Sequence, residues 1–188
     1  MILIRHGQSE FNAAFNRTGI DPGIPDAPLT AQGRSQVQRA AEELRGLIGQ
    51  GRPIRRLVTS PYTRALQTAA IIAEALDLPL TVEPLVREHA FYHCDIGTAT
   101  SILAANWPAL SFGHLPETWW SARDESEAQL LERCSLFHAT ATGWSDWRQV
   151  AVVSHWGFIR GLTGHDARNA ELIDFDPTKR AIRSLLRD

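Results

Sequence analysis

The chain has 188 residues, of which 44% are apolar and 21% are charged, ordinary values for a soluble globular enzyme with a sizeable core. We expect residues 1–188 to form a single domain. The formal net charge of −2 excludes a general nucleic-acid binder, which would carry a basic surface.

The cysteine content and the start of the chain bear on the cellular compartment of the protein. Cys94 and Cys134 lie far apart without CxxC spacing, so we expect free thiols rather than a disulfide framework or a thiolate metal site. The chain begins directly with strand-forming residues, which leaves no room for a signal peptide, and no apolar run approaches a membrane span of roughly 20 residues. These features predict a cytoplasmic protein without a membrane partner. The sequence leaves the oligomeric state open.

The first third of the chain alternates between short apolar runs and amphipathic stretches. An apolar run at 1–4 predicts a buried strand, and the Gly, Pro and Asp content of 16–28 predicts a loop. Thr30 is a good N-cap for a helix over 31–48, whose apolar residues recur at helical spacing. A strand at 57–59 is followed by Ser60-Pro61, a pair typical of the start of a helix, and that helix should reach residue 76.

The rest of the chain continues this alternation. The expected elements are, in order, a strand at 80–82, an irregular stretch over 89–122, a helix at 126–142, a strand at 150–154, a short helix at 158–162 and an edge strand at 170–175. The tail at 181–186 could form a strand or a short helix.

Strands that alternate with helices imply an α/β fold of three layers, with a mostly parallel central sheet and helices on both faces. Chemically active residues follow several of the predicted strands, namely Arg5-His6, the segment 60–64, Glu88 and His155. Since ligands bind at the carboxyl ends of such strands, we expect these side chains to meet at one edge of the sheet.

The tripeptide Arg5-His6-Gly7 carries the chemistry at the first of these strand ends. Arg5 offers a fixed fork of donors to a phosphate or carboxylate, and the imidazole of His6 can act as a nucleophile or a base. Gly7 would let the backbone turn in a conformation that other residues resist.

The order of several motifs resembles a known family. The motifs are Arg5-His6-Gly7 with Asn12, Leu29-Thr30-Ala31-Gln32-Gly33, Ser60-Pro61-Tyr62-Thr63-Arg64-Ala65-Leu66-Gln67-Thr68-Ala69, Glu88, and Ser154-His155-Trp156-Gly157. Together they resemble the histidine phosphatase superfamily, in its phosphoglycerate-mutase-like branch, over most of the chain. The resemblance implies a phosphoglycerate-mutase-like fold and no cofactor.

The resemblance also implies roles for the motif residues. His6 would attack phosphorus and become a transient phosphohistidine, while Arg5 and Arg64 would hold the phosphoryl oxygens. His155 would be a second histidine that donates to the phosphate. Glu88 would be the proton donor to the leaving alkoxide, with Glu83 and Asp95 as alternatives.

Further contacts to the substrate are expected from Asn12, which would donate to a phosphoryl oxygen unless it only caps a helix, and from Gln8 and the backbone of Trp156. A zinc site at His89 and His93 is an alternative, but the residues around them disfavour a regular helix and no carboxylate motif completes the set. We therefore expect no metal.

The expected function is metal-independent hydrolysis of a small phosphomonoester. One alternative is a phosphoglycerate-type mutase, and another is a non-catalytic phosphate-binding or regulatory module. Residues 89–122 are expected to be an insertion that covers the pocket. Its three tryptophans, Trp107, Trp119 and Trp120, could line the pocket or fill a small satellite core.

Overall fold

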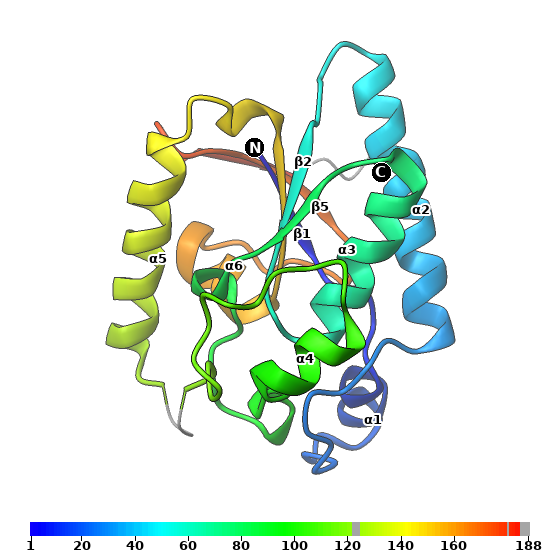
Figure 1. The fold of residues 1–188 in the computed structure, drawn as a ribbon, viewed down its shortest axis with the longest axis vertical. Coiled ribbons are helices and arrows are strands. Elements are labelled where there is room, and N and C mark those ends of the chain that lie inside the picture. The colour runs from blue at the N-terminus through cyan, green and yellow to red at the C-terminus, as the bar shows by residue number, and fades with distance from the viewer. Residues whose placement is uncertain (122–124, 180, 185–188) are drawn as a thin grey trace.

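The computed structural model describes residues 1–121, 125–179 and 181–184 and has three layers (Figure 1). Helices α2 (Ala31–Gly49) and α3 (Thr63–Leu76) cover one face of a central sheet. Helices α5 (Glu127–Gly143) and α6 (Trp156–Thr163) cover the other face. The predicted α/β/α architecture is confirmed.

The sheet has six strands among the described residues. Their order across the sheet is β3 (Leu80–Val82), β2 (Arg56–Thr59), β4 (Val150–Ser154), β1 (Ile2–Arg5), β5 (Leu172–Asp176) and β6 (Ala181–Ser184). The first four are parallel, whereas β5 runs antiparallel to β1 and β6 antiparallel to β5. The strand predicted at 170–175 forms as β5, but its predicted edge position is wrong, because the tail pairs outside it as β6. Residues 185–186 of the predicted tail element lie outside the described residues.

The apolar runs of the central strands are explained by burial on both faces. In β1, Ile2 and Ile4 pack into the cluster beneath α2 and α3, whereas Leu3 packs with Met1 into the cluster beneath α5 and α6. Strand β4 alternates in the same way. A strand with helices on both sides has no polar face, which is why polar and apolar residues do not alternate in these runs.

Helix α1 (Glu10–Thr18) was not expected, and it overlaps the loop predicted from residue 16. Ser9 and Asn12 form a capping box: Ser9 Oγ accepts from the backbone N–H of Asn12 at 3.2 Å, and Asn12 Oδ1 accepts from that of Ser9 at 3.1 Å. The helix therefore begins directly after the Arg5-His6-Gly7 motif and places its side chains beside it.

Helix α3 begins at Thr63, and its N-cap is Tyr62, two residues later than the predicted Ser60 cap. The carboxylate of Asp26, from the distant loop, accepts hydrogen bonds from the backbone N–H of Thr63 at 2.8 Å and from its hydroxyl at 2.7 Å. A side chain remote in sequence thus satisfies the helix start, which no local pattern could indicate.

The irregular stretch contains α4 (Thr100–Asn106) and packs below the sheet in Figure 1. Trp119 is buried in a cluster with Tyr62 and Leu66 of the α3 region, its ring edge-on to Tyr62 with 4.7 Å between centroids. Its indole N–H donates to the carbonyl of Thr98 at 2.8 Å. Trp107 and Trp120 pack against the same cluster, so the satellite-core interpretation holds for all three.

Replacing Trp119 with alanine is expected to destabilise the fold by about 3–5 kcal/mol, the usual cost of removing a buried tryptophan. Urea unfolding measures that loss. The relative rates on different phosphate esters should stay as they are in the parent, because Trp119 is not among the residues that line the cavity described below. A changed ester preference at unaltered stability would contradict this placement.

One finding bears on membranes. Within the described ranges, no helix has both the length and the apolar content needed to cross a bilayer.

Candidate active site

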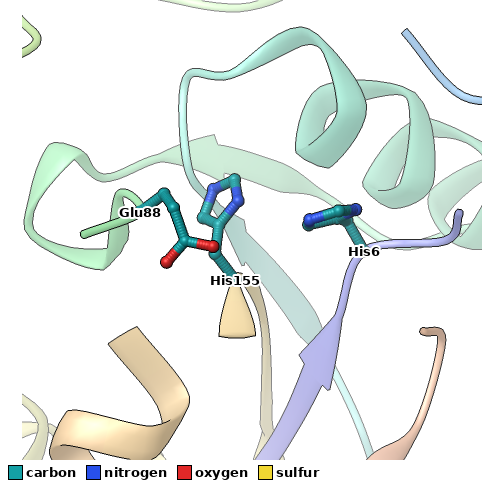
Figure 2. A group of neighbouring side chains, drawn as sticks. All are labelled: His6, Glu88 and His155. Atoms are coloured by element: carbon teal, nitrogen blue, oxygen red, sulfur yellow. The ribbon is translucent and has the colours of Figure 1, made fainter. Parts of the chain in front are cut away.

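The predicted convergence at the carboxyl edge of the sheet is present. His6 directly follows β1 and His155 directly follows the adjacent parallel strand β4, while Glu88 follows the short turn after β3. One nitrogen or oxygen from each of these three side chains lies within 4.8 Å of the other two. Figure 2 shows His155 between His6 and Glu88.

His6 and Glu88 line a cavity of about 390 Å³ at the same edge, whereas His155 is buried beside them and is not among its lining residues. Its lining residues are Arg5, His6, Ser9, Phe11, Asn12, Phe15, Asn16, Arg64, Glu88, His89, Phe91, Tyr92, Cys94, Asp95, Trp156 and Gly157. A larger cavity of about 660 Å³ lies at the opposite end of β1, beside Met1 and Arg52. We assign the candidate site to the smaller one, because His6 and the converging Arg5 and Arg64 line it.

A backbone carbonyl fixes the tautomer of the His6 imidazole. Its Nδ1 lies 2.7 Å from the carbonyl oxygen of Gly7. A carbonyl can only accept, so the proton is on Nδ1 and the lone pair of Nε2 is left for reaction. Burial, and then the positive charges of Arg64 and Arg5, hold the pKa of His6 well below its usual 6.5.

His155 is completely buried, and both of its ring nitrogens are without a hydrogen-bond partner in the described part of the chain. Burial and the nearby Arg64 hold its pKa well below 6.5. Its ring lies 5.1 Å from that of His6 and packs edge-on against Tyr62. A buried imidazole with unsatisfied nitrogens beside His6 is suited to donate to a bound anion.

The two arginines are fixed by different contacts. Arg5 Nη1 donates to the carbonyl of Ala167 at 2.8 Å, and its Nε is buried without a partner among the described residues. Arg64 is buried in the first turn of α3, where Nη1 donates to the carbonyl of Cys94 and Nη2 to Asp95 Oδ1 at 3.0 Å. Both arginines are among the residues that line the cavity.

Glu88 is held by backbone N–H groups. Its Oε1 accepts from His89 at 2.9 Å, from Gly157 at 2.8 Å and from Phe158 at 3.3 Å, the last two being in the first turn of α6. Oε2 makes no hydrogen bond within the described ranges. Burial, and then the neighbouring Asp95 carboxylate, raise the pKa of Glu88 above its usual 4.5. A carboxyl group that keeps its proton to higher pH is suited to be a general acid.

The sequence model of the family described as the histidine phosphatase superfamily (branch 1) matches residues 1–182. The chain belongs to this superfamily. Its resemblance to the family, inferred from the order of its motifs, is therefore confirmed.

Individual relatives agree with that membership. A glucosyl-3-phosphoglycerate phosphatase of Mycolicibacterium vanbaalenii is 28% identical over 171 residues, which are 87% of this chain and 72% of the relative. A probable phosphoglycerate mutase of an Enterobacter species is 36% identical over 86 residues, but the match spans only 46% of this chain and 36% of that protein. The solved structure of a mycobacterial glucosyl-3-phosphoglycerate phosphatase complexed with VO3 has a TM-score of 0.63 at 22% identity, and the match covers 100% and 98% of the two chains. That likeness shows the shared fold.

Of the remaining residues predicted to contact the substrate of this histidine phosphatase, two line the cavity and one does not. Asn12 lines the cavity, and its Oδ1 is occupied by the capping box and by Asn169 Nδ2 at 3.3 Å, which leaves its own N–H₂ group to donate. Trp156 also lines the cavity. Gln8 is not among the lining residues, and its Oε1 accepts from the Thr30 hydroxyl at 2.8 Å instead.

The φ of Gly7 is not positive, so its backbone conformation does not require glycine. The space around it does. A Cβ atom at Gly7 would lie 2.6 Å from the carbonyl oxygen of Gly33, and one at Gly33 would lie 2.1 Å from that of Gln8. The two glycines therefore let α2 approach the loop after β1 closely. The expectation of a special backbone turn at Gly7 is wrong.

Arg133 was not identified from the sequence. It is a buried residue of α5 whose Nε and Nη2 bind the carboxylate of Glu125 at 2.8 and 2.6 Å. Its Nη1 donates to the carbonyls of Leu85 and Arg87, and its Nη2 also donates to that of Glu88. Arg133 thus fixes the segment that carries Glu88. Its helical spacing from the apolar Leu130, Phe137 and Ala141, which places a charge on the buried face, was the available signal.

The alternative zinc site at His89 and His93 is not formed. His89 Nε2 lies 2.7 Å from the carbonyl of Glu125, whereas His93 Nδ1 lies 3.0 Å from Asp21 Oδ2. The group close enough to hold a cation, among the described residues, is His6 with Glu88 and His155. Two guanidinium groups share that cavity, and their charge favours an anion there.

Proposed function

We propose that this histidine phosphatase is a metal-independent phosphomonoester hydrolase that acts through a phosphohistidine on His6. The observation that carries the proposal is the unprotonated Nε2 of His6 beside two arginines, with a carboxyl group of raised pKa close by. A nucleophile, an anion clamp and an acid are the three groups that phosphoryl transfer to nitrogen needs.

In the first step Nε2 of His6 forms a bond to phosphorus as the ester P–O bond breaks. Arg5, Arg64 and His155 hold the phosphoryl oxygens, joined by the amide of Asn12. Glu88 gives its proton to the departing alkoxide. In the second step Glu88 accepts a proton from water, whose oxygen attacks phosphorus, and phosphate leaves His6. We assign no role in either step to Gln8.

The substrate in this proposal is a small phosphorylated molecule, without nucleic acid or membrane. Residues 89–95 of the irregular stretch supply part of the cavity lining and so part of its cover. A cytoplasmic location suits the two cysteines, which are both free and buried.

The competing mutase function gains support from relatives named as probable phosphoglycerate mutases. A mutase must keep water away from its phosphohistidine between turnovers. Here three aromatic residues of the cavity lining are themselves open to solvent, with exposed fractions of 66% for Phe91 and 37% each for Tyr92 and Trp156. Such a cavity favours water as the phosphoryl acceptor.

Incubation with a panel of phosphomonoesters that includes 3-phosphoglycerate tests this choice. We expect release of inorganic phosphate without isomerised product, whether or not a bisphosphate primer is present. Isomerisation faster than phosphate release in the primed reaction would establish the mutase instead. Tight phosphate binding with no turnover on any ester would favour the non-catalytic module.

A further inference from the structure

Five aromatic residues line the cavity, namely Phe11, Phe15, Phe91, Tyr92 and Trp156, hereafter the aromatic rim. They come from three separate segments, namely α1, the stretch after Glu88, and the first position of α6. None is needed for the chemical steps proposed above. Because these five residues line one cavity, they bear on which substrate binds there.

The rim is an ordered apolar surface. Phe11 and Phe15 are stacked with centroids 5.4 Å apart, and the ring of Tyr92 lies 5.3 Å from the first and 5.1 Å from the second. Phe91 packs edge-on against Tyr92. Asp95 Oδ2 accepts hydrogen bonds from the backbone N–H groups of both Phe91 and Tyr92, which ties this side of the rim to Arg64 through the same carboxylate.

Part of this apolar surface is uncovered. Phe91, Tyr92 and Trp156 are three of the large hydrophobic side chains exposed among the described residues, and all three border this cavity. Exposed large apolar groups that cluster at a cavity mark a binding surface more often than chance exposure does. An apolar ligand group placed there would bury surface that is now in water.

The charges of the lining disfavour a second anionic group on the substrate. Among the described lining residues, the full positive charges are Arg5 and Arg64 and the carboxylates are Glu88 and Asp95. Asp95 is paired with Arg64 in a buried contact of 3.0 Å. The arginines are assigned to the phosphoryl group, so a carboxylate on the rest of the substrate would meet aromatic faces, with no third arginine or lysine among the described lining residues to pair with it.

We infer that the substrate is the phosphate monoester of an uncharged aromatic or arylalkyl alcohol, whose ring stacks on the aromatic rim. This inference rests on the proposed function for the phosphoryl end of the site and adds the class of the leaving alcohol. It separates this chain from an enzyme for carboxylate-bearing phosphoglycerates.

Binding is tested without turnover by calorimetry with three phosphonates, which lack the scissile P–O bond: ethylphosphonate, benzylphosphonate and 4-carboxybenzylphosphonate. We expect benzylphosphonate to bind at least about tenfold more tightly than ethylphosphonate, as burial of one ring on aromatic side chains allows. The added carboxylate should reverse most of that gain. The matching phosphate esters are then compared by kcat/KM for phosphate release.

Rim variants show whether these side chains cause the preference. Phe91→Ala and Trp156→Ala should each lower the ratio of the ethylphosphonate to the benzylphosphonate dissociation constant by several-fold. The double variant should bring this ratio close to one. Leu136→Ala, which removes an exposed side chain of α5 away from the cavity, should keep the parent ratio. Phe91 is 66% exposed, so its variant should fold even if the Trp156 variant does not.

The outcomes separate the two proposals. Equal binding of the three phosphonates, or a benzyl preference that survives the rim substitutions, overturns the inference while phosphate release from the esters still upholds the hydrolase. A rim-dependent benzyl preference without hydrolysis of any ester upholds the rim and overturns the hydrolase.

Discussion

Replacing His6 with alanine is expected to lower kcat by roughly four to six orders of magnitude, the loss typical when a covalent nucleophile is removed. The reason lies in the tautomer that the Gly7 carbonyl imposes, which directs the free lone pair of Nε2 to the reaction. Rapid alkaline quench of the parent enzyme with a radiolabelled ester, followed by peptide mapping under alkaline conditions, should locate an acid-labile phosphate on His6.

A surface histidine provides the matched control for this experiment. His114 is exposed and is not part of the cavity lining, so His114→Ala should form the phosphoenzyme at the parent rate. Substantial turnover in His6→Ala, or label on a residue other than His6, would show that the covalent mechanism is wrong.

Changing Glu88 to glutamine is expected to lower kcat about 10²–10⁴-fold on an alkyl phosphate, because the alkoxide then leaves without a proton. On an aryl phosphate such as p-nitrophenyl phosphate the loss should be much smaller, since that leaving group departs unaided. Gln keeps an oxygen to accept the backbone N–H groups that Glu88 Oε1 binds, so the fold around α6 should persist.

The pH profile gives the same assignment a second readout. The reactive form needs His6 neutral, which requires a pH above its lowered pKa, and Glu88 protonated, which requires a pH below its raised pKa. At ordinary values of about 6.5 and 4.5 these conditions would hardly overlap, so the two opposite shifts widen the pH range in which both hold. In Glu88→Gln the loss of alkyl-phosphate activity on the alkaline side of that range should disappear.

Arg64→Lys is the control for the leaving-group test. It keeps a positive charge for Asp95 but removes the fork that holds the phosphoryl oxygens, so alkyl and aryl phosphates should lose activity to the same extent. An equal loss for both ester types in Glu88→Gln would move the acid role to another residue.

The sequence by itself determined the layered fold and the convergence of Arg5, His6, Glu88 and His155. Both follow from local patterns, because apolar runs alternate with amphipathic helices and parallel strands must end at a common edge. Each of these four residues comes at or soon after a strand. The turn between β3 and Glu88 is short, so the order of the strands alone brings the four residues together. The order of the motifs was sufficient to indicate the family.

Only the tertiary structure decided what surrounds that centre. Asp26 caps α3 from 37 residues away in sequence, Arg133 holds the backbone of Glu88 from 45 residues away, and α1 brings Phe11 to Tyr92. The need for glycine at position 7 likewise comes from the approach of α2, and the role of Trp119 from its contact with Tyr62. A local pattern records what one segment prefers, whereas these contacts depend on which distant segment packs against it. Those packing partners exist only once the sheet and its two helical layers have come together.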